Sequence, residues 1–439
     1  MNIKIHGTHD PQTIKQLEVC VAAEDGARGV LCADGHVGYF MPIGGVVAYR
    51  NFISPSGVGY DIACGNKAVR TNLKMSDIEA DLPRFADEIQ RRISFGIGRV
   101  NDEKVDHPVL DQIRSADVPE QRGLSQLAAN QLGTVGSGNH YVDVLEDSDG
   151  IVWVACHFGS RGFGHKTASM FMNAAKGLPM LGQSHDGEMF SPPLLLDVNS
   201  TLGQSYISAM NLAGAYAYAG RDLVVSKVLD ILGATSEYSV HNHHNFAWQE
   251  AHGLGYPVWV VRKGATPLCP RQQGFVGGSM DDLCVVLEGV DSEKSVDSLY
   301  STVHGAGRVM SRNQAIKGKH VWVCQAAAGG YVEANFAACL DVRFTPPSVQ
   351  PPKDMKCPVC RGPLLKSQLS APINFRDVQD RVKMHGVILR GAGADESPEV
   401  YRTLLEVLEA HTGTFVVKAT MRPRIVVMAS KDTHDPYKE

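Results

Sequence analysis

The sequence has no long apolar run. A membrane-spanning helix needs about eighteen consecutive apolar residues, and no segment of the sequence comes near that length. Its first residues also lack a charged segment followed by an apolar core and a cleavage site. The ten cysteines are scattered and form only one close pair, which argues against a disulfide framework. We therefore expect a cytoplasmic protein that makes no membrane contact and keeps its thiols reduced.

An excess of basic residues is also missing. The formal net charge of −5 excludes a wholly basic nucleic-acid binder, so any nucleic acid would have to meet a local basic surface. Glycine, by contrast, is abundant: 44 glycines in 439 residues indicate many tight turns and close backbone approaches. With 44% hydrophobic and 20% charged residues, the composition is typical of a globular protein that could form one large domain or two to three smaller ones.

Metal-binding residue types follow several short segments that have the pattern of strands or glycine loops. Carboxylate oxygen, thiolate sulfur and imidazole nitrogen together suit a borderline transition metal such as manganese, iron, cobalt or zinc, and a thiolate can bridge two ions. Each residue alone is equally well explained as a hydrogen-bonded, half-buried polar side chain. The candidate ligands are Asp61, Cys64, His140, His157 and His244.

A histidine followed by two glycines and two arginines occurs in Ser301-Thr-Val-His304-Gly-Ala-Gly-Arg308-Val-Met-Ser-Arg312. An imidazole beside bare backbone N–H groups and guanidinium groups can hold a phosphate against a nucleophile, so His304 is the candidate nucleophile. The alternative is a histidine in a tight glycine turn. Arg308, Arg312 and Arg161 would bind phosphates, or else form ordinary salt bridges.

Three other segments carry structural predictions. Residues from about Leu202 to Leu232 have the composition of one or two helices, and Ser397-Pro398-Glu399 has the cap, proline and acidic residue of a helix start. Residues 325–375 are rich in proline and contain Cys357-Pro-Val-Cys360, which indicates an insertion. Cys357 and Cys360, with Cys324 and Cys339, are candidates for a structural zinc site.

Seven motifs occur in order along the chain and are together far more specific than any single glycine-rich match. They closely resemble the motifs of the RtcB RNA-splicing ligase family, over a stretch from about Asp34 to Ala429. The motifs are Gly57-Val-Gly-Tyr-Asp61-Ile-Ala-Cys64-Gly65, Gly136-Ser-Gly-Asn139-His140-Tyr-Val-Asp143, His157-Phe-Gly-Ser-Arg-Gly-Phe-Gly-His165, His243-His244-Asn245-Phe, Arg262-Lys-Gly-Ala265, Gly278-Ser-Met280 and His304-Gly-Ala-Gly-Arg-Val-Met-Ser-Arg312.

The resemblance implies a ligase, dependent on GTP and manganese, that joins RNA ends carrying a 2′,3′-cyclic phosphate or 3′-phosphate to ends carrying a 5′-hydroxyl. His304 would be guanylylated, and the five candidate ligands would hold two manganese ions with Cys64 between them. The nucleotide pocket would comprise Asn139, Asp143, Gly278, Ser279, Met280, Ala306, Gly307 and Tyr401. Asp34-Gly-His36 matches an early family motif of less specific role and reads as a polar loop before a strand. The resemblance does not indicate which protein factor, if any, would activate the ligase.

The implied fold is α/β (α+β), a single compact domain over residues 1–439 with stacked β-sheets at its centre and the active site in a cleft at strand ends. Three features depart from the family pattern. Asp143 stands where the family usually has Glu, Ala429 stands about where it has a nucleotide-contacting Lys, and Asp281-Asp282 add negative charge beside the Gly278 loop. The alternatives are a metal-dependent phosphatase or nucleotide hydrolase on the same scaffold, and a non-catalytic RNA-end binder, which the intact His304 disfavours.

Overall fold

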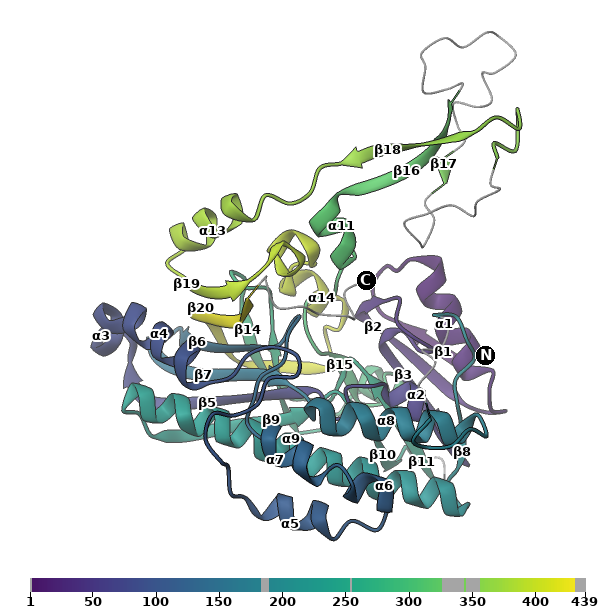
Figure 1. Cartoon of the computed structure of the whole chain (residues 1–439), viewed down its shortest axis with the longest axis horizontal. Coiled ribbons are helices and arrows are strands. Elements are labelled where there is room, and N and C mark those ends of the chain that lie inside the picture. Colours follow the sequence, from purple (N-terminus) through teal and green to yellow (C-terminus); the bar gives the residue numbers. More distant parts are fainter. Residues whose placement is uncertain (1, 183–188, 253–254, 326–342, 345–355, 431–439) are drawn as a thin grey trace.

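The structure is a computed structural model that describes residues 2–182, 189–252, 255–325, 343–344 and 356–430. Its largest element is an eight-stranded, mainly antiparallel sheet (Figure 1). Its strands follow the order β13 (Gln273–Gly277), β14 (Cys284–Gly289), β20 (Phe415–Ser430), β6 (Tyr141–Asp147), β7 (Ile151–Phe158), β5 (Gly65–Lys74) and β9 (Ser236–His243), and β19 (Ile388–Ala392) pairs with β20 in parallel.

This large sheet curls until its first and last strands approach each other. The Phe275 N–H in β13 donates to Asn242 Oδ1 in β9 over 3.2 Å, and the Asn66 side-chain amide donates to the Phe275 carbonyl over 3.0 Å. The sheet is therefore nearly a barrel. Its interior is filled by buried side chains from these strands, including Ala68, Leu145, Trp153, Ala155, Val240, Phe275, Val286 and Met421.

Alternation along the strands separates two faces of this sheet. In β7, Trp153 and Ala155 belong to the interior cluster, whereas Val152, Val154 and Cys156 belong to a second core outside it. That outer core is covered by α4 (Leu82–Arg92) and α9 (Thr201–Leu232). His157 continues the inward series of β7, so the strand delivers its imidazole to the end of the barrel interior.

A second, five-stranded sheet stacks against the first. Its order is β1 (Asn2–Ile5), β2 (Arg28–His36), β3 (Ile43–Tyr49), β11 (Pro257–Lys263) and β10 (Asn245–Ala251). Val30, Val46 and Val260 of this sheet share one apolar core with Val285 and Leu287 of the large sheet. The predicted α/β fold, a single compact domain with stacked sheets at its centre, is thus confirmed.

Short elements connect and cover the sheets. The helical ones are α1 (Pro11–Val21), α2 (Pro55–Val58), α3 (Met75–Ile78), η1 (Glu79–Asp81), α5 (Pro108–Arg114), α6 (Pro119–Arg122), α7 (Ser125–Gln131), α8 (Arg161–Ala175), α10 (Glu293–Asp297), η3 (Ala394–Glu396), η4 (Pro398–Val400) and α14 (Leu404–Ala410). The strands β4 (Phe52–Ile53) and β8 (Leu196–Asp197) form one small pair, and β12 (Ala265–Pro267) and β15 (Ser301–Val303) form another. No helix in the described ranges is long and apolar enough to cross a membrane.

An arm projects from this body between α11 (Arg312–Lys317) and α13 (Phe375–Met384) (Figure 1). Its strands are β16 (Lys319–Cys324), β17 (Arg343–Phe344) and β18 (Leu364–Ser370), paired in the order β17-β16-β18. The arm coincides with the segment predicted as an insertion, of which residues 326–342 and 345–355 lie outside the described ranges.

Three local predictions can be compared with the structure. The stretch from Leu202 to Leu232 forms one helix, as expected. The helix predicted to begin at Ser397 is wrong, because only a 3-10 turn forms before Tyr401 adopts an extended backbone that bridges to Arg308. Asp34 is also not in a loop but near the end of β2.

The N-terminus of α9 offers a test of local stability. Ser200 caps it, with its Oγ accepting from the Gly203 N–H at 3.0 Å. We expect Ser200→Ala to lower the free energy of unfolding by about 1 kcal/mol, because one helix donor loses its acceptor. Thermal and urea unfolding measure this. Ser226→Ala, at an exposed interior position of the same helix, is the matched control and should be neutral or slightly stabilising.

Candidate active site and metal centre

One cavity of about 300 Å³ opens where strand ends of the two stacked sheets face each other. Every residue predicted from the sequence as a metal ligand, nucleophile or nucleotide contact lines it, although these residues run from Asp61 to Tyr401 along the chain. They come from segments at the ends of β5, β6, β7, β9, β13 and β15 and from the turn after η4. The fold therefore collects scattered polar residues in one place.

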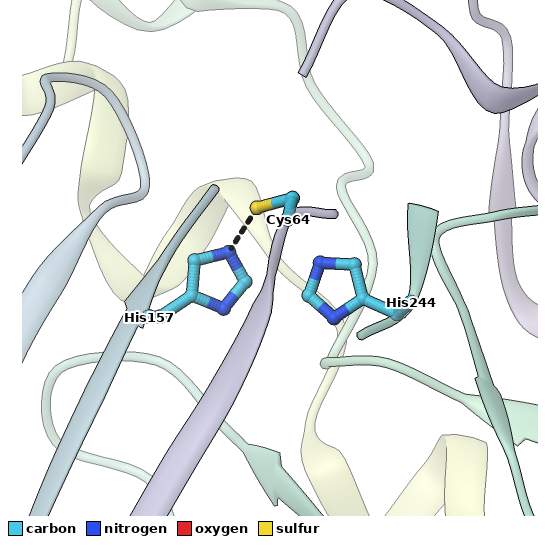
Figure 2. A group of neighbouring side chains, drawn as sticks. All are labelled: Cys64, His157 and His244. Atoms are coloured by element: carbon cyan, nitrogen blue, oxygen red, sulfur yellow. Dashed lines mark hydrogen bonds between the residues drawn. The ribbon is translucent and has the colours of Figure 1, made fainter. Parts of the chain in front are cut away.

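The five candidate metal ligands form two groups that share Cys64. In one group the donor atoms of Cys64, His157 and His244 lie within 4.8 Å of one another, and in the other those of Asp61, Cys64 and His140 do. Figure 2 shows the two imidazoles of the first group beside the Cys64 sulfur, which lies 3.4 Å from His157 Nε2. The sulfur is also 3.6 Å from His140 Nε2, which in turn lies 3.1 Å from Asp61 Oδ2. A thiolate in this position could contact two ions.

Burial dominates the electrostatics of these ligands. It lowers the pKa of His157 and His244 well below the usual value, with a further contribution from neighbouring imidazoles, so both rings are neutral and keep a lone pair for a metal. Burial raises the pKa of Asp61, but the hydrogen bond and charge of His140 outweigh it and bring it to about 2. Burial, and then the Asp61 charge, raise the pKa of the Cys64 thiol well above its usual range.

Neighbouring groups hold the ligands in orientation. His157 Nδ1 is 2.7 Å from the Asn66 side-chain oxygen, so Nδ1 donates and Nε2 is left to face Cys64. Gly159 lies so close to the Asp61 carboxylate that a Cβ at this position would collide with it. The turn after β7 therefore needs a glycine to bring the carboxylate to the site.

Arg221 of α9 is fully buried and connects three ligand-bearing segments. Its Nη1 donates to the carbonyl oxygens of Ala63 and Phe158, at 3.0 and 2.6 Å. Nε donates to His241 Nε2 at 2.9 Å, and Nη2 lies 2.8 Å from His243 Nδ1. Ala63, Phe158 and His243 each adjoin a candidate ligand in sequence, and Ala63 has a left-handed φ of 61°. One guanidinium thus holds a strained loop and two strand ends together.

His304 is oriented by Asp34. His304 Nδ1 lies 2.6 Å from Asp34 Oδ2, and the same oxygen accepts the backbone N–H groups of His304 at 2.9 Å and Gly305 at 3.3 Å. Because an ionised carboxylate can only accept, Nδ1 carries the proton and Nε2 keeps the lone pair. The His304 ring centroid lies 4.8 Å from that of His244. A ring nitrogen with an available lone pair therefore lies beside the candidate metal-ligand groups.

The residues predicted to contact a nucleotide form the rest of the cavity wall around His304. Asp143 is buried, which raises the pKa of its carboxyl well above the usual value, and its Oδ1 has no partner among the described residues. The Tyr401 hydroxyl donates to Glu396 and accepts from Arg308 over 3.0 Å. Gly307, with φ of 76°, presses against the Asp34 backbone.

The two extra carboxylates beside the Gly278 loop are used by the scaffold. Asp281 pairs with Arg381 at 3.5 Å and with His385 at 3.3 Å. Asp282 accepts the Leu404 N–H at 2.8 Å, at the start of α14. Neither side chain lines the cavity, so the loop adds little uncompensated negative charge to it.

The arginines near His304 have carboxylate partners. Arg312 pairs with Asp395 at 3.1 Å and with Glu396, and Arg308 lies 3.5 Å from Glu396. Both line the cavity, but their charges are balanced within the protein. Arg161 differs, because its Nε is buried without a hydrogen-bond partner among the described residues and the side chain lines a neighbouring cavity.

That second cavity has a volume of about 770 Å³ and adjoins the first, with which it shares Asp61, Asn139, His140 and Arg312. Besides Arg161, its walls include Lys166 and His165, whose ring stacks on Tyr60 at 5.1 Å between centroids. Apolar side chains, such as Leu124, Leu127 and Met170, cover the rest. It is a large, partly basic groove that leads to the metal-ligand groups.

Sequence reasoning missed Asn66 and Arg221 and assigned Asp34 only a vague role. Asn66 is a single polar residue in a strand, and nothing in the sequence around it indicates a functional role. Arg221 does carry one, since it interrupts the apolar series of a long helix. The contact of Asp34 with His304 joins residues 270 positions apart and needed the fold.

The donor set fits a pair of transition-metal ions. The Nε2 atoms of His140 and His157 face the Cys64 sulfur, at 3.6 and 3.4 Å, and are the nitrogens that would bind an ion. Imidazole nitrogen, carboxylate oxygen and thiol sulfur gather in two groups that share Cys64, and this mixture of donors suits borderline transition metals. The fit favours a borderline metal such as manganese or zinc and does not select among them.

Comparison with known proteins gives one family. The family model described as "tRNA-splicing ligase RtcB" matches residues 20–122 and 110–335, a range that includes every predicted site residue except Tyr401. The chain is 32% identical to "RNA-splicing ligase RtcB homolog 1" of Entamoeba histolytica over 364 residues, covering 66% of this chain and 68% of that protein. It is 32% identical to "tRNA-splicing ligase RtcB" of Aeropyrum pernix over 384 residues, or 70% and 79% of the two chains. Identity to "RNA-splicing ligase RtcB" of Escherichia coli is 30% over 310 residues, or 65% and 74%.

The shared position of Cys64 in both ligand groups predicts the effect of its replacement. We expect Cys64→Ser to reduce manganese binding from two ions per chain to at most one, because a hydroxyl is a poor bridging anion. In the unaltered protein, affinity should rise with pH, because the thiol has a raised pKa and must lose its proton to bind. Titration calorimetry and metal analysis measure both effects.

A suitable control is Cys156→Ala. This thiol is the sequence neighbour of His157 but faces the opposite core, so its loss should leave the metal count at two. Equal metal counts in the Cys64→Ser and Cys156→Ala proteins would contradict a bridging role for Cys64.

Proposed function

The chain belongs to the tRNA-splicing ligase RtcB family, and from this membership we propose that it joins RNA 2′,3′-cyclic phosphate or 3′-phosphate ends to 5′-hydroxyl ends, using GTP and two manganese ions. The relatives from Entamoeba histolytica, Aeropyrum pernix and Escherichia coli carry RNA-splicing or tRNA-splicing ligase names, which supports ligation as the reaction class. A cytoplasmic location is part of the same proposal.

The observation that carries the proposal is the contact between Asp34 and His304 inside the cavity that holds the metal-ligand groups. A structural histidine would use both ring nitrogens for packing or hydrogen bonds. Here one nitrogen is bound to a fully buried carboxylate and the other is left as a lone-pair donor in a polar cavity. This is the arrangement of a nucleophile with an orienting partner.

In the proposed first step, His304 Nε2 attacks the α-phosphorus of GTP. The new N–P bond replaces the bond to pyrophosphate, which leaves, and Asp34 stabilises the positive charge that develops on the imidazole. A 2′,3′-cyclic phosphate end would first take up one water, which breaks the bond between phosphorus and O2′ and leaves a 3′-phosphate and a 2′-hydroxyl. The guanylate then passes from His304 to the RNA 3′-phosphate, which restores the free imidazole. Finally, the 5′-hydroxyl oxygen attacks the activated 3′-phosphate, a phosphodiester forms and GMP leaves.

Manganese, held by Asp61, Cys64, His140, His157 and His244, would neutralise charge on phosphate oxygens and on leaving groups. The protein side of this arrangement is the fixed orientation of the ligands. Asn66 holds the His157 ring, and Arg221 holds the backbone beside Cys64 and His157, so hydrogen bonds within the protein orient these ligands.

The nucleotide would lie in the cavity beside His304. The residues that would surround it line the same cavity: Asn139, Asp143, the Gly278-Ser279-Met280 loop, Ala306, Gly307 and Tyr401. The raised pKa of Asp143 means that this carboxyl can be protonated and donate a hydrogen bond to a base. Ala429, which stands about where the family pattern has a lysine, is buried and does not line the cavity, whereas Val426 and Met428 of the same strand do, so base preference would depend on the residues that line it.

The RNA would approach through the 770 Å³ groove, which adjoins the metal-ligand groups and presents Arg161, His165 and Lys166. These side chains would supply the local basic surface that a chain with a net charge of −5 needs in order to bind RNA. Contacts to phosphates position an RNA strand without recognising its bases. A ligase that joins RNA ends of different sequence requires binding of this kind.

Replacing the nucleophile tests the proposal. With manganese and GTP, the unaltered protein should gain the mass of one guanylate, and His304→Ala should gain none. His304→Ala should also fail to ligate 3′-phosphate RNA to 5′-hydroxyl RNA, yet still ligate a preformed guanylylated 3′ end, because that step does not use the imidazole. Intact mass spectrometry with each of the four NTPs measures the adduct. No adduct with any NTP would overturn the proposal and favour a phosphatase or nucleotide hydrolase.

A graded variant separates orientation from folding in the same assay. Asp34→Asn keeps the shape but can donate to Nδ1 and favour the wrong tautomer, so adduct formation should slow by up to about 10⁴-fold. His107→Asn is the matched control, since it changes a histidine that caps α5 outside the cavity and should form the adduct normally.

Lys166 tests the route of the RNA. Lys166 is exposed on the wall of the second cavity, outside the first. We expect Lys166→Ala to weaken RNA binding and reduce the slope of log affinity against log salt by about 1, the value for one lost phosphate contact, while the guanylate adduct still forms. Fluorescence anisotropy at several salt concentrations measures this. Lys15→Ala, in α1 and away from both cavities, is the control; equal slopes in the two variants would rule out this route.

A further inference from the structure

The outer end of the projecting arm gathers three cysteines. Cys324 is the last residue of β16, and Cys357 and Cys360 lie in the turn that leads into β18. Their sulfur atoms are all within 4.8 Å of one another, and those of Cys324 and Cys360 are 3.3 Å apart. The fourth candidate named from the sequence, Cys339, lies outside the described residues. The cluster is separate from the cavities described above, and the proposed ligation does not use it.

These distances suit a shared metal ion better than a covalent bond. Two thiolates on a tetrahedral zinc ion, each at about 2.3 Å, are about 3.8 Å apart, which lies within the observed spread. A disulfide requires about 2.05 Å between the sulfurs. The spacing Cys357-x-x-Cys360 is also typical of the loops that supply two thiolates to structural zinc.

The turn around Cys357 is built to hold thiolates. Gly362 N–H donates to Cys360 Sγ over 3.4 Å, and Arg361, with a left-handed φ of 59°, directs the chain back so that Cys357 N–H donates to the Gly362 carbonyl over 2.9 Å. The turn therefore folds the chain back on itself and fixes the Cys360 sulfur beside Cys357.

The paired strands also converge at this point. Gln325 N–H donates to the Pro363 carbonyl over 3.0 Å, and Lys356 forms a bridge with Pro363. An ion at the three sulfurs would fasten the end of β16 to the start of β18 and close the chain between them. Such a clip stabilises a projecting element that has few neighbours of its own.

We propose that Cys324, Cys357 and Cys360 bind one zinc ion through their thiolates and that this ion fastens the outer end of the β16–β18 arm. The ion is structural. Its loss loosens the arm and leaves the manganese centre and the chemistry at His304 in place.

Metal analysis of the full-length protein tests this site. Zinc could also enter the other metal centre, so the measurement uses Cys64→Ala as background. That protein should retain one zinc per chain, and adding Cys357→Ser and Cys360→Ser should reduce the zinc to zero. Adding Cys269→Ser instead, which changes a half-exposed thiol elsewhere, should leave one zinc. Absence of zinc in the background protein, or an unchanged content in the triple variant, would overturn the proposal.

Two further measurements remain decisive if the serine variant does not fold. Cobalt exchanged into the Cys64→Ala protein should give a strong thiolate-to-cobalt charge-transfer band, and a thiol-binding mercurial should release one zinc as three thiols react. A Cys324–Cys360 disulfide, seen as a mass two hydrogens lower without bound metal, would also overturn the proposal. In the folded double serine variant, limited proteolysis should cleave the arm faster, while the guanylate adduct forms at the normal rate.

Discussion

The arrangement of the site depends on a buried cation in α9. The Arg221 guanidinium reaches the backbone before β5, the end of β7 and the imidazoles at the end of β9, which are neighbouring strands of the large sheet whose ends all carry candidate ligands. Burial lowers its pKa, so keeping this charge away from water costs free energy that only a full set of acceptors offsets. Its acceptors are two backbone carbonyls and two neutral imidazoles rather than a carboxylate. The neighbouring ligands are therefore held without adding negative charge that would compete with them for metal.

Strand geometry explains why so many functional groups meet there. The interior of the curled sheet is apolar through most of its depth, with Trp153, Leu145 and Phe275, and becomes polar at one end. Asn66, Asp143 and His157 occupy inward positions at that end, where the second sheet covers the opening and supplies Asp34. The same alternation that fills the barrel thus aims polar side chains at a single cavity. A shift of one residue in β7 would replace His157 at this inward position by Cys156 or Phe158.

Much of the site could be read from the sequence because its residues lie in short local motifs. Asp61 and Cys64 share one loop, and Asn139, His140 and Asp143 lie close together where the next loop enters β6, so each motif can be recognised from the local sequence alone. The stacked sheets were expected only from the family resemblance, whereas the α9 helix was predictable from the composition of its residues. Partnerships over long distances were not: nothing near Asp34 shows that it will bind His304, and nothing near Asp281 and Asp282 shows that Arg381 and the α14 backbone will take up their charges.

The helix expected at Ser397 failed for a related reason. Its local signals are good, but Val309 N–H donates to the Val400 carbonyl and Arg402 N–H to the Gly307 carbonyl, so pairing with the nucleophile loop pulls the chain into an extended form. Tertiary hydrogen bonds overrode helix propensity, and the result is that Tyr401 faces the cavity.

The mixed donor set around Cys64 has a consequence for how the protein acquires its ions. Among the divalent first-row metals, manganese binds nitrogen and sulfur ligands most weakly, whereas zinc and copper bind them far more strongly. Three imidazoles and a thiolate therefore do not favour manganese by affinity. Occupancy of the proposed metal centre would therefore follow the concentrations of free ions that the chain meets while it folds, and the metal history of a sample, more than its sequence, would decide which ion is bound.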